Sequence, residues 1–279
     1  TAGDPYSVAD GKLSTMGWPS RYRVNQIAVA PDGSLALASS AGLFLQRPNG
    51  WQPVGIADNG GRSWATHDVL GTAFDSLGQL WFATKAGVGC RAAGGWKFFE
   101  GKDGLPWNDF TGVAAGPDGE VWFGTRLGAI RYDGREWHYR QGPAWLPHDD
   151  VANVAVDGRG QAWFATAGGV GSIERQPMTL AQKAEFYEGE IERHVKRTPF
   201  GYVAEAHLRK PPDKSSADPQ DSDNDGLWTA MYGAGECLAY AATRDPKAKE
   251  RAKQAFEALR FLQKVTQGGT PAPPKGYIA

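Results

Sequence analysis

Short apolar runs separated by glycine-containing turns recur four times in the first 176 residues. The turn glycines are spaced by 45, 41 and 41 residues and are Gly33, Gly78, Gly119 and Gly160. A second set keeps the same spacings and consists of Gly42, Gly87, Gly128 and Gly169. Apolar runs bounded by such turns predict short β-strands, and each repeat has room for four of them.

Tryptophan follows the same register. One set lies in the second predicted strand of its repeat and consists of Trp81, Trp122 and Trp163; a later set begins the fourth strand and consists of Trp51, Trp96 and Trp137. Repeats of about 40 residues with four strands are typical of β-propeller blades. We therefore predict a propeller-like array of four four-stranded blades, with Trp81, Trp122 and Trp163 buried between sheets. The first repeat differs, because it has Ala36-Leu37 where the others have Trp-Phe.

One stretch carries a family resemblance. Asp103-Gly104-Leu105-Pro106-Trp107-Asn108, followed by Gly119-Glu120-Val121-Trp122-Phe123-Gly124-Thr125, resembles the two-component-regulator propeller repeat. The resemblance extends over residues 4–175. It implies a propeller module for ligand sensing or protein assembly, in a family whose propellers commonly have more blades than four.

The two ends of the repeat region complement each other. The fourth repeat has no late-Trp strand after Ile173, whereas residues 5–10 look like a spare fourth strand. We predict that residues 5–10 pair with the last repeat and close a ring, which would hide both sheet edges. The alternative is a part of a larger propeller.

After Met178 the apolar spacing becomes helical. It predicts helices over residues 180–197, 227–243 and 246–266, with a polar connector over residues 210–219. Thr179 and Asp245 have the side chains of N-caps, and Pro246 suits the first helical position. The fold class is thus mainly β with an α segment, divided into propeller repeats (1–176) and a helical region (177–279).

The helical region resembles the opening of an (α/α) toroid of carbohydrate-processing proteins. The residues that carry this resemblance are Arg193-His194-Val195-Lys196-Arg197, the acidic segment 221–232 and the Asp245-Pro246 helix start. It implies a polysaccharide lyase or glycoside hydrolase. Because toroids need many more helices, we expect this chain to be the front portion of a longer protein and to be inactive by itself.

Charge and composition restrict the partners. The chain has 30 Lys and Arg against 31 Asp and Glu, so its net charge of −1 argues against a nucleic-acid partner. No apolar run approaches the ~20 residues of a membrane span. Cys90 and Cys237 have no metal-binding spacing, and we expect no disulfide between them. The start at Thr1 suggests a processed, secreted or periplasmic chain, or a trimmed one. Expected partners are a polysaccharide or another protein chain.

Asp221-Ser222-Asp223-Asn224-Asp225-Gly226 carries the densest chemistry. Alternating carboxylates before a glycine match the first half of a calcium loop, with Asp221, Asp223 and Asp225 as ligands. However, Tyr232 stands where the bidentate Glu belongs, and Glu236 comes one turn late. The same carboxylates could instead cap a helix, or serve in acid–base catalysis. The three interpretations stay open.

The end of the first predicted helix supplies further candidates. His194 could act with Asp223 and Asp225 as a catalytic group, or simply complement the helix C-terminus. Arg197 could bind a sugar carboxylate in bidentate fashion, with Trp228 and Tyr232 as further substrate-binding residues. Apart from possible calcium, the sequence predicts no cofactor.

Overall fold

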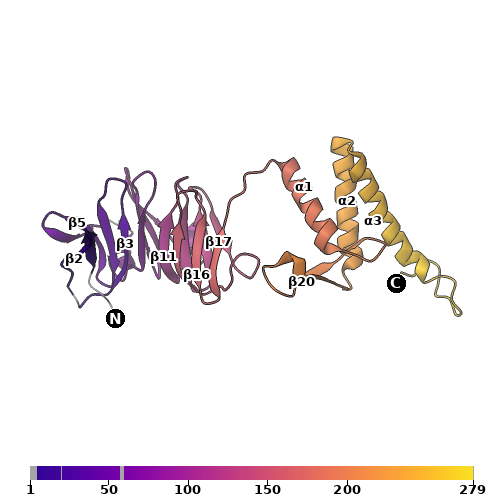
Figure 1. Ribbon diagram of the computed structural model, residues 1–279, viewed down its shortest axis with the longest axis horizontal. Coiled ribbons are helices and arrows are strands. Elements are labelled where there is room, and N and C mark those ends of the chain that lie inside the picture. Colours follow the sequence, from indigo (N-terminus) through magenta and orange to yellow (C-terminus); the bar gives the residue numbers. More distant parts are fainter. Residues whose placement is uncertain (1–4, 20, 57–59, 279) are drawn as a thin grey trace. The chain divides into compact units, whose positions relative to one another are not determined.

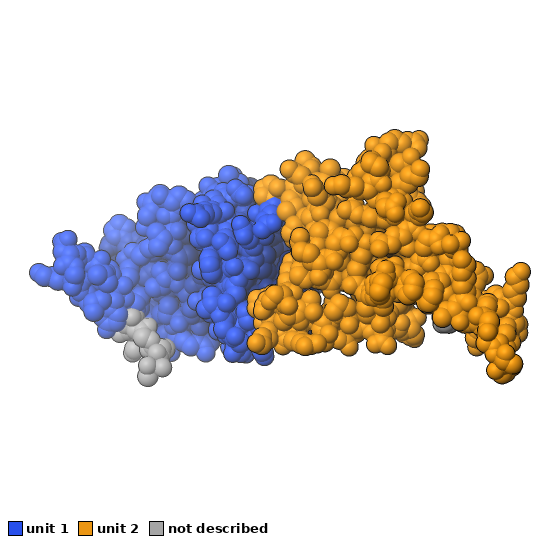
Figure 2. Space-filling view, turned by 45° about the vertical axis from the view of Figure 1, so that its right-hand side comes forward, with its two compact units in different colours: residues 1–176 blue, residues 177–279 orange. Residues whose placement is uncertain are grey.

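The computed structural model of the chain describes residues 5–19, 21–56 and 60–278. Contacts within the chain divide it after Gln176 into two compact units, coloured separately in Figure 2. We call residues 1–176 unit 1 and residues 177–279 unit 2, and each is described by itself.

In the residues that the structure describes, unit 1 contains four antiparallel sheets, one per repeat, and a two-stranded sheet near its amino terminus. The first sheet consists of β3 (Val24–Val29), β4 (Leu35–Ser39), β5 (Gly42–Arg47) and β6 (Gly50–Pro53). The second consists of β7 (Gly71–Phe74), β8 (Leu80–Thr84), β9 (Gly87–Ala92) and β10 (Gly95–Phe99). The third consists of β11 (Phe110–Ala115), β12 (Val121–Thr125), β13 (Gly128–Tyr132) and β14 (Trp137–Arg140). The fourth consists of β15 (Val151–Val156), β16 (Ala162–Thr166) and β17 (Gly169–Ile173). The propeller-type fold is confirmed, although the fourth sheet has three strands instead of the predicted four.

Consecutive sheets stack through their first strands, β3 on β7, β7 on β11 and β11 on β15. Figure 1 shows this order along unit 1 in the labels β3, β11 and β16. Trp81 and Trp122 are buried between sheets, as predicted, with 4% and 3% of their surface exposed. Trp163 is 41% exposed, so its predicted burial is wrong. Trp163 lies on the face of the fourth sheet that a further repeat would cover, and the fourth repeat is the last one in unit 1.

Aspartate side chains build the turns that hold two of these tryptophans. Asp75 accepts hydrogen bonds from the backbone N–H of Leu77 and Gln79, and Trp81 Nε1 donates to its second carboxylate oxygen at 2.8 Å. Asp157 accepts in the same way from Trp163 Nε1 at 3.2 Å. The turn residue before the strand therefore orients the tryptophan, which is why the two recur together in the sequence.

The amino-terminal residues form their own hairpin. β1 (Tyr6–Ala9) pairs with β2 (Lys12–Thr15), and Ala9 lies opposite Lys12. Asp10 and Gly11 have φ of 49° and 71°, the left-handed values that a two-residue hairpin turn requires. The prediction that residues 5–10 pair with the fourth sheet is therefore wrong. The Asp10-Gly11 turn pairs two strands that follow each other directly in the sequence. This short loop costs far less entropy to close than a pairing of residues 5–10 with the fourth sheet, which lies far away in the sequence.

Unit 2 starts with α1 (Leu180–Glu190), continued by a π-helical turn (Ile191–Val195). Two small strand pairs follow, β18 (Lys196–Arg197) with β19 (Tyr202–Val203) and β20 (Glu205–Leu208) with β21 (Ala217–Gln220). The helices α2 (Asp225–Thr243) and α3 (Pro246–Val265) complete the unit. The first helix thus ends before its predicted limit, and part of the predicted polar connector is strand. Thr179 and Asp245 are N-caps, as predicted.

The α2–α3 hairpin packs closely at Gly233. A Cβ at this position would lie 2.9 Å from the Cβ of Ala255, so the small residue allows the two helices to approach. Tyr202 anchors β19 on the hairpin by donating its hydroxyl proton to the carbonyl oxygen of Ala258 at 2.7 Å. Within the described ranges, no helix combines the length and the apolar composition that crossing a membrane requires.

The two cysteines are free thiols, as predicted. Cys90 is buried in β9, where burial raises the pKa of its thiol to about 12. Cys237 lies on an exposed part of α2.

Candidate functional site

Five charged or polar side chains meet between the elements of unit 2. We call this group the polar cluster: Glu188 of α1, Lys196 of β18, Tyr232 and Glu236 of α2, and Arg251 of α3. The Tyr232 hydroxyl donates to Glu188 Oε2 at 2.8 Å, and Arg251 Nε lies 3.2 Å from the same oxygen. Arg251 Nη1 is 3.7 Å from Glu236 Oε2, and Lys196 Nζ lies 5.5 Å from the centre of the Tyr232 ring.

Burial perturbs the acidic groups of the polar cluster. The side chains of Glu188 and Glu236 are only 16% and 9% exposed. Desolvation and the neighbouring negative charge of Glu188 raise the pKa of Glu236 to about 7, although Arg251 and Lys196 oppose the shift. Desolvation and the hydrogen bond to Glu188 also raise the pKa of Tyr232. A carboxyl group that exchanges its proton near neutral pH is suited to acid–base chemistry.

A second arrangement lies where α2 begins. Arg197 of β18 forms an ion pair with the buried carboxylate of Asp225, the first residue of α2. The Ser222 hydroxyl donates to the other Asp225 oxygen at 3.2 Å. A carboxylate in the first turn also complements the helix dipole. Asn224 is the N-cap of α2 and makes no side-chain capping bond. Asp225 is the first residue of the helix and lies inside it rather than before it.

Two donors beside this ion pair have no acceptor. Arg197 Nε and Trp228 Nε1 are buried, and no hydrogen-bond acceptor among the described residues reaches either of them. Trp228 follows Asp225 by three positions on α2, so its side chain lies on the same side of the helix. Buried donors are rarely left without a partner, which makes these two side chains candidates for binding an oxygen-bearing group.

The remaining predicted site residues are placed apart from these contacts. Asp221 and Asp223 are exposed in the loop before α2, and His194 is half-buried in the π-helical turn. In the described part of the chain, no three His, Cys, Asp or Glu side chains converge as a metal site requires. Calcium at Asp221, Asp223 and Asp225, and catalysis by Asp223, Asp225 and His194, therefore stay predictions.

The sequence predicted Tyr232 as a substrate-binding residue and placed Glu236 near the acidic segment, as a late metal ligand or as a partner of its carboxylates. The prediction missed Glu188, Lys196 and Arg251, which complete the polar cluster. The available signal was the i, i+4 spacing of Tyr232 and Glu236, which places both on one face of α2. Polar residues so spaced on a largely apolar helix indicate a buried polar contact with the neighbouring helices.

Replacing Glu236 with glutamine should make unit 2 more stable at pH 8 and less sensitive to pH. The raised pKa means that the folded state binds more protons than the unfolded state between the ordinary pKa of 4.5 and about 7. Stability from this group is thus full below the lower value and is lost as the pH rises to the upper one. We expect Glu236→Gln to gain about 1 to 3 kcal/mol at pH 8. Urea unfolding followed by circular dichroism from pH 4.5 to 8 measures this, with Glu250→Gln, at an exposed position of α3, as the control. Equal pH slopes in the unmodified chain and both variants would contradict the prediction.

Neither a family model nor a curated protein matches the chain. Among solved structures it resembles the extracellular domain of BT3049 from B. thetaiotaomicron, described as a hybrid two-component system (TM-score 0.47, 17% identity, 58% of this chain and 23% of that one). It also resembles that of BT4673, described as a one-component system (0.48, 15%, 64% and 26%). A third is virginiamycin B lyase from Staphylococcus aureus (0.45, 16%, 65% and 66%). The chain spans about a quarter of the length of the first two.

Proposed function

We propose that this chain is a propeller module, located outside the cytoplasm, joined to the first helices of an (α/α) toroid in a carbohydrate-processing protein. In this proposal unit 2 binds an acidic polysaccharide at the start of α2. The observation that carries it is the pair of buried, unpartnered donors, Arg197 Nε and Trp228 Nε1.

These donors suit a sugar carboxylate. A guanidinium group binds carboxylates through parallel N–H donors, and the Nε–H of Arg197 has no acceptor among the described residues while another nitrogen holds Asp225. An indole N–H adds a directional donor for a carboxylate or hydroxyl oxygen, and the indole ring provides an apolar surface for the C–H face of a sugar. Both residues are those that the sequence predicted to bind substrate.

The side chains of the polar cluster are of the types that serve in acid–base chemistry, but they pair with one another. Tyr232 donates to Glu188, and Glu188 also pairs with Arg251. Glycoside cleavage requires an acid and a base that both reach the substrate. The chain by itself should therefore bind weakly without turnover, and the Glu236 carboxyl would take part in proton transfer only in a larger protein that opens a cleft beside it.

Binding of the whole chain to polygalacturonate, alginate and hyaluronate, with dextran as a neutral control, tests the proposal. Calorimetry gives the affinity, while product absorbance and reducing ends report turnover, each with calcium and with a chelator. We expect binding to an acidic polymer that Arg197→Gln and Trp228→Phe each weaken by about fivefold or more. Trp107→Phe, at an exposed tryptophan of unit 1, is the matched control and should change nothing.

Each outcome bears on a different part of the proposal: the site, the ligand, catalysis or calcium. Binding that survives both substitutions would contradict the site, and binding to dextran as strong as to the acidic polymers would contradict the acidic ligand. Turnover lost in Asp225→Asn would show that the chain is itself catalytic. A calcium-dependent affinity would support the predicted ligands Asp221, Asp223 and Asp225.

A second candidate function is protein assembly through the propeller. One observation favours it: the outer face of the fourth sheet exposes Trp163 and Val170, at 41% and 70%. These two residues border a shallow cavity of about 220 Å³ on that face. If no polysaccharide binds, this function is the better account of the chain.

A further inference from the structure

The first repeat lacks the two side chains that fill the space between the second and third sheets. In the second repeat, Trp81 projects towards the third sheet and donates its indole N–H to Asp75 at 2.8 Å. In the first repeat the corresponding residues, 45 positions earlier, are Ala36 and Ala30. An indole and a carboxylate are thus both replaced by methyl groups on the side of the first sheet that faces the second.

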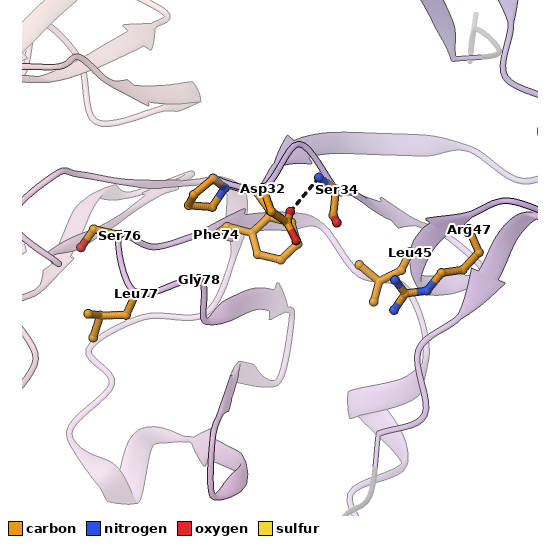
Figure 3. Close-up of a pocket in the computed structure, with 10 residues that line it drawn as sticks. Asp32, Ser34, Leu45, Arg47, Phe74, Ser76, Leu77 and Gly78 are labelled. Carbon is orange, nitrogen blue, oxygen red and sulfur yellow. Dashed lines mark hydrogen bonds between the residues drawn. The ribbon is translucent and has the colours of Figure 1, made fainter.

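A cleft lies between the first and second sheets. Ala30 borders this cleft, whereas Ala36 is fully buried in the core cluster against which Leu45 and Phe74 pack. The cleft consists of two adjoining cavities of about 420 and 470 Å³, which share Leu45, Phe74, Leu77 and Gly78. Ala30 lines the first cavity, and Leu45 lies across from Ala36 in the β4–β5 register. Figure 3 shows Leu45 and Arg47 of β5 on one side of Phe74, and Leu77 and Gly78 on the other. Cavities of this size accommodate small organic ligands.

The walls combine an apolar surface with positive charge. Leu45 and Phe74 are half-buried and Leu77 is exposed, so apolar side chains line the interior and the rim. Arg47 borders one cavity and Arg91 the other, and both are exposed. The carboxylate near them, Asp32, accepts a hydrogen bond from the backbone N–H of Ser34 at 2.8 Å (Figure 3). That bond occupies one of its oxygens, and the two arginines leave the cleft with an excess of positive charge.

The repeat register also indicates what lies against a ring in this cleft. In the third sheet, Tyr132 packs on Trp81 with ring centres 5.6 Å apart. The equivalent residue of the second sheet, 41 positions earlier, is Arg91. A planar ring bound in the cleft beside Arg91 would therefore face a guanidinium group, which stacks favourably on aromatic rings.

From these contacts we propose that the cleft binds a small aromatic carboxylate. The ring lies between Leu45, Phe74 and Arg91. The carboxylate faces Arg47 and Arg91 at the mouth. The site belongs to unit 1 alone and does not rest on the function proposed for unit 2.

Indole-3-acetate tests the proposal with the whole chain, because it has both the ring and the charge. Indole tests the ring alone and acetate the charge alone. Saturation-transfer NMR and calorimetry should show indole-3-acetate binding with a Kd on the order of 1 mM or tighter. Indole should bind at least about fivefold more weakly, and acetate should not bind measurably.

Substitutions locate the site. Arg47→Gln and Arg91→Gln lie at the surface and should each weaken indole-3-acetate binding by about threefold to tenfold without changing the circular dichroism spectrum. Arg135→Gln, an exposed arginine of the third repeat, is the matched control and should bind normally. Ala30→Asp places a carboxylate at the first cavity and should weaken binding of the anionic probe by charge repulsion.

Three outcomes would overturn the proposal. One is the absence of indole-3-acetate binding at 10 mM probe, a concentration about tenfold above the expected Kd. Another is that the Arg47→Gln, Arg91→Gln and Arg135→Gln variants all bind indole-3-acetate as strongly as the unmodified chain does. A third is binding of a digalacturonate probe that Arg47→Gln removes while indole-3-acetate does not bind, which would assign the cleft to acidic sugars. If Ala30→Asp does not fold, the two surface arginine variants still decide the question.

Discussion

Replacing Trp122 with alanine should lower the free energy of unfolding of unit 1 by about 3 to 5 kcal/mol. Trp122 is 3% exposed and packs edge-on against Phe164, with ring centres 5.5 Å apart, between the third and fourth sheets. A buried tryptophan removes about 200 Å² from water, and alanine would leave a cavity between sheets that cannot collapse on it. Its indole N–H has no acceptor among the described residues, so the loss comes from packing alone. Guanidinium unfolding followed by circular dichroism measures the change.

The fourth repeat provides the control at the same repeat position. Trp163 is 41% exposed and holds one hydrogen bond to Asp157. Trp163→Ala should therefore cost about 1 kcal/mol or less, because little packing and one exposed hydrogen bond are lost. If both substitutions cost the same, the packing of tryptophan between stacked sheets is not what stabilises the array.

Gly128→Ala should cost about 3 to 5 kcal/mol, the second large effect that we expect. Gly128 begins β13 with a φ of 104°, and a Cβ there would lie 2.5 Å from the carbonyl oxygen of Arg140. That oxygen belongs to the backbone of the paired strand β14, so it cannot move without disturbing the sheet. Thermal and denaturant unfolding of the full chain test the expectation.

Gly134→Ala isolates the two causes. Gly134 has a similar φ of 93°, but a Cβ there would meet no atom within 4 Å. Its substitution should carry the left-handed backbone strain alone, about 1 kcal/mol. Equal losses at the two positions would mean that strain, rather than the contact with Arg140, determines the role of the repeated glycine.

The sequence by itself determined the local order of unit 1 and the helix starts of unit 2. A turn glycine, a Trp-Phe strand and a Thr turn recur at fixed spacing because each sheet closes through short-range contacts, such as Thr125 Oγ1 donating to the carbonyl oxygen of Gly128. Thr179 and Asp245 were identified as caps for the same reason, since a cap bonds only within its own first turn. Such contacts leave a mark at a constant separation along the chain.

Only the tertiary structure decided which faces are covered and which charged groups meet. Trp163 repeats Trp81 and Trp122 in sequence, but whether it is buried depends on a neighbouring sheet that its own repeat does not encode. Tyr6 and its neighbours could extend the fourth sheet or pair locally, and the Asp10-Gly11 turn favours the local partner. The polar cluster joins Glu188 to Arg251 across 63 residues, and the charged state of Glu236 depends on burial among three elements. Burial and long-range electrostatics are properties of the packed chain, whereas turns and caps are properties of a few consecutive residues.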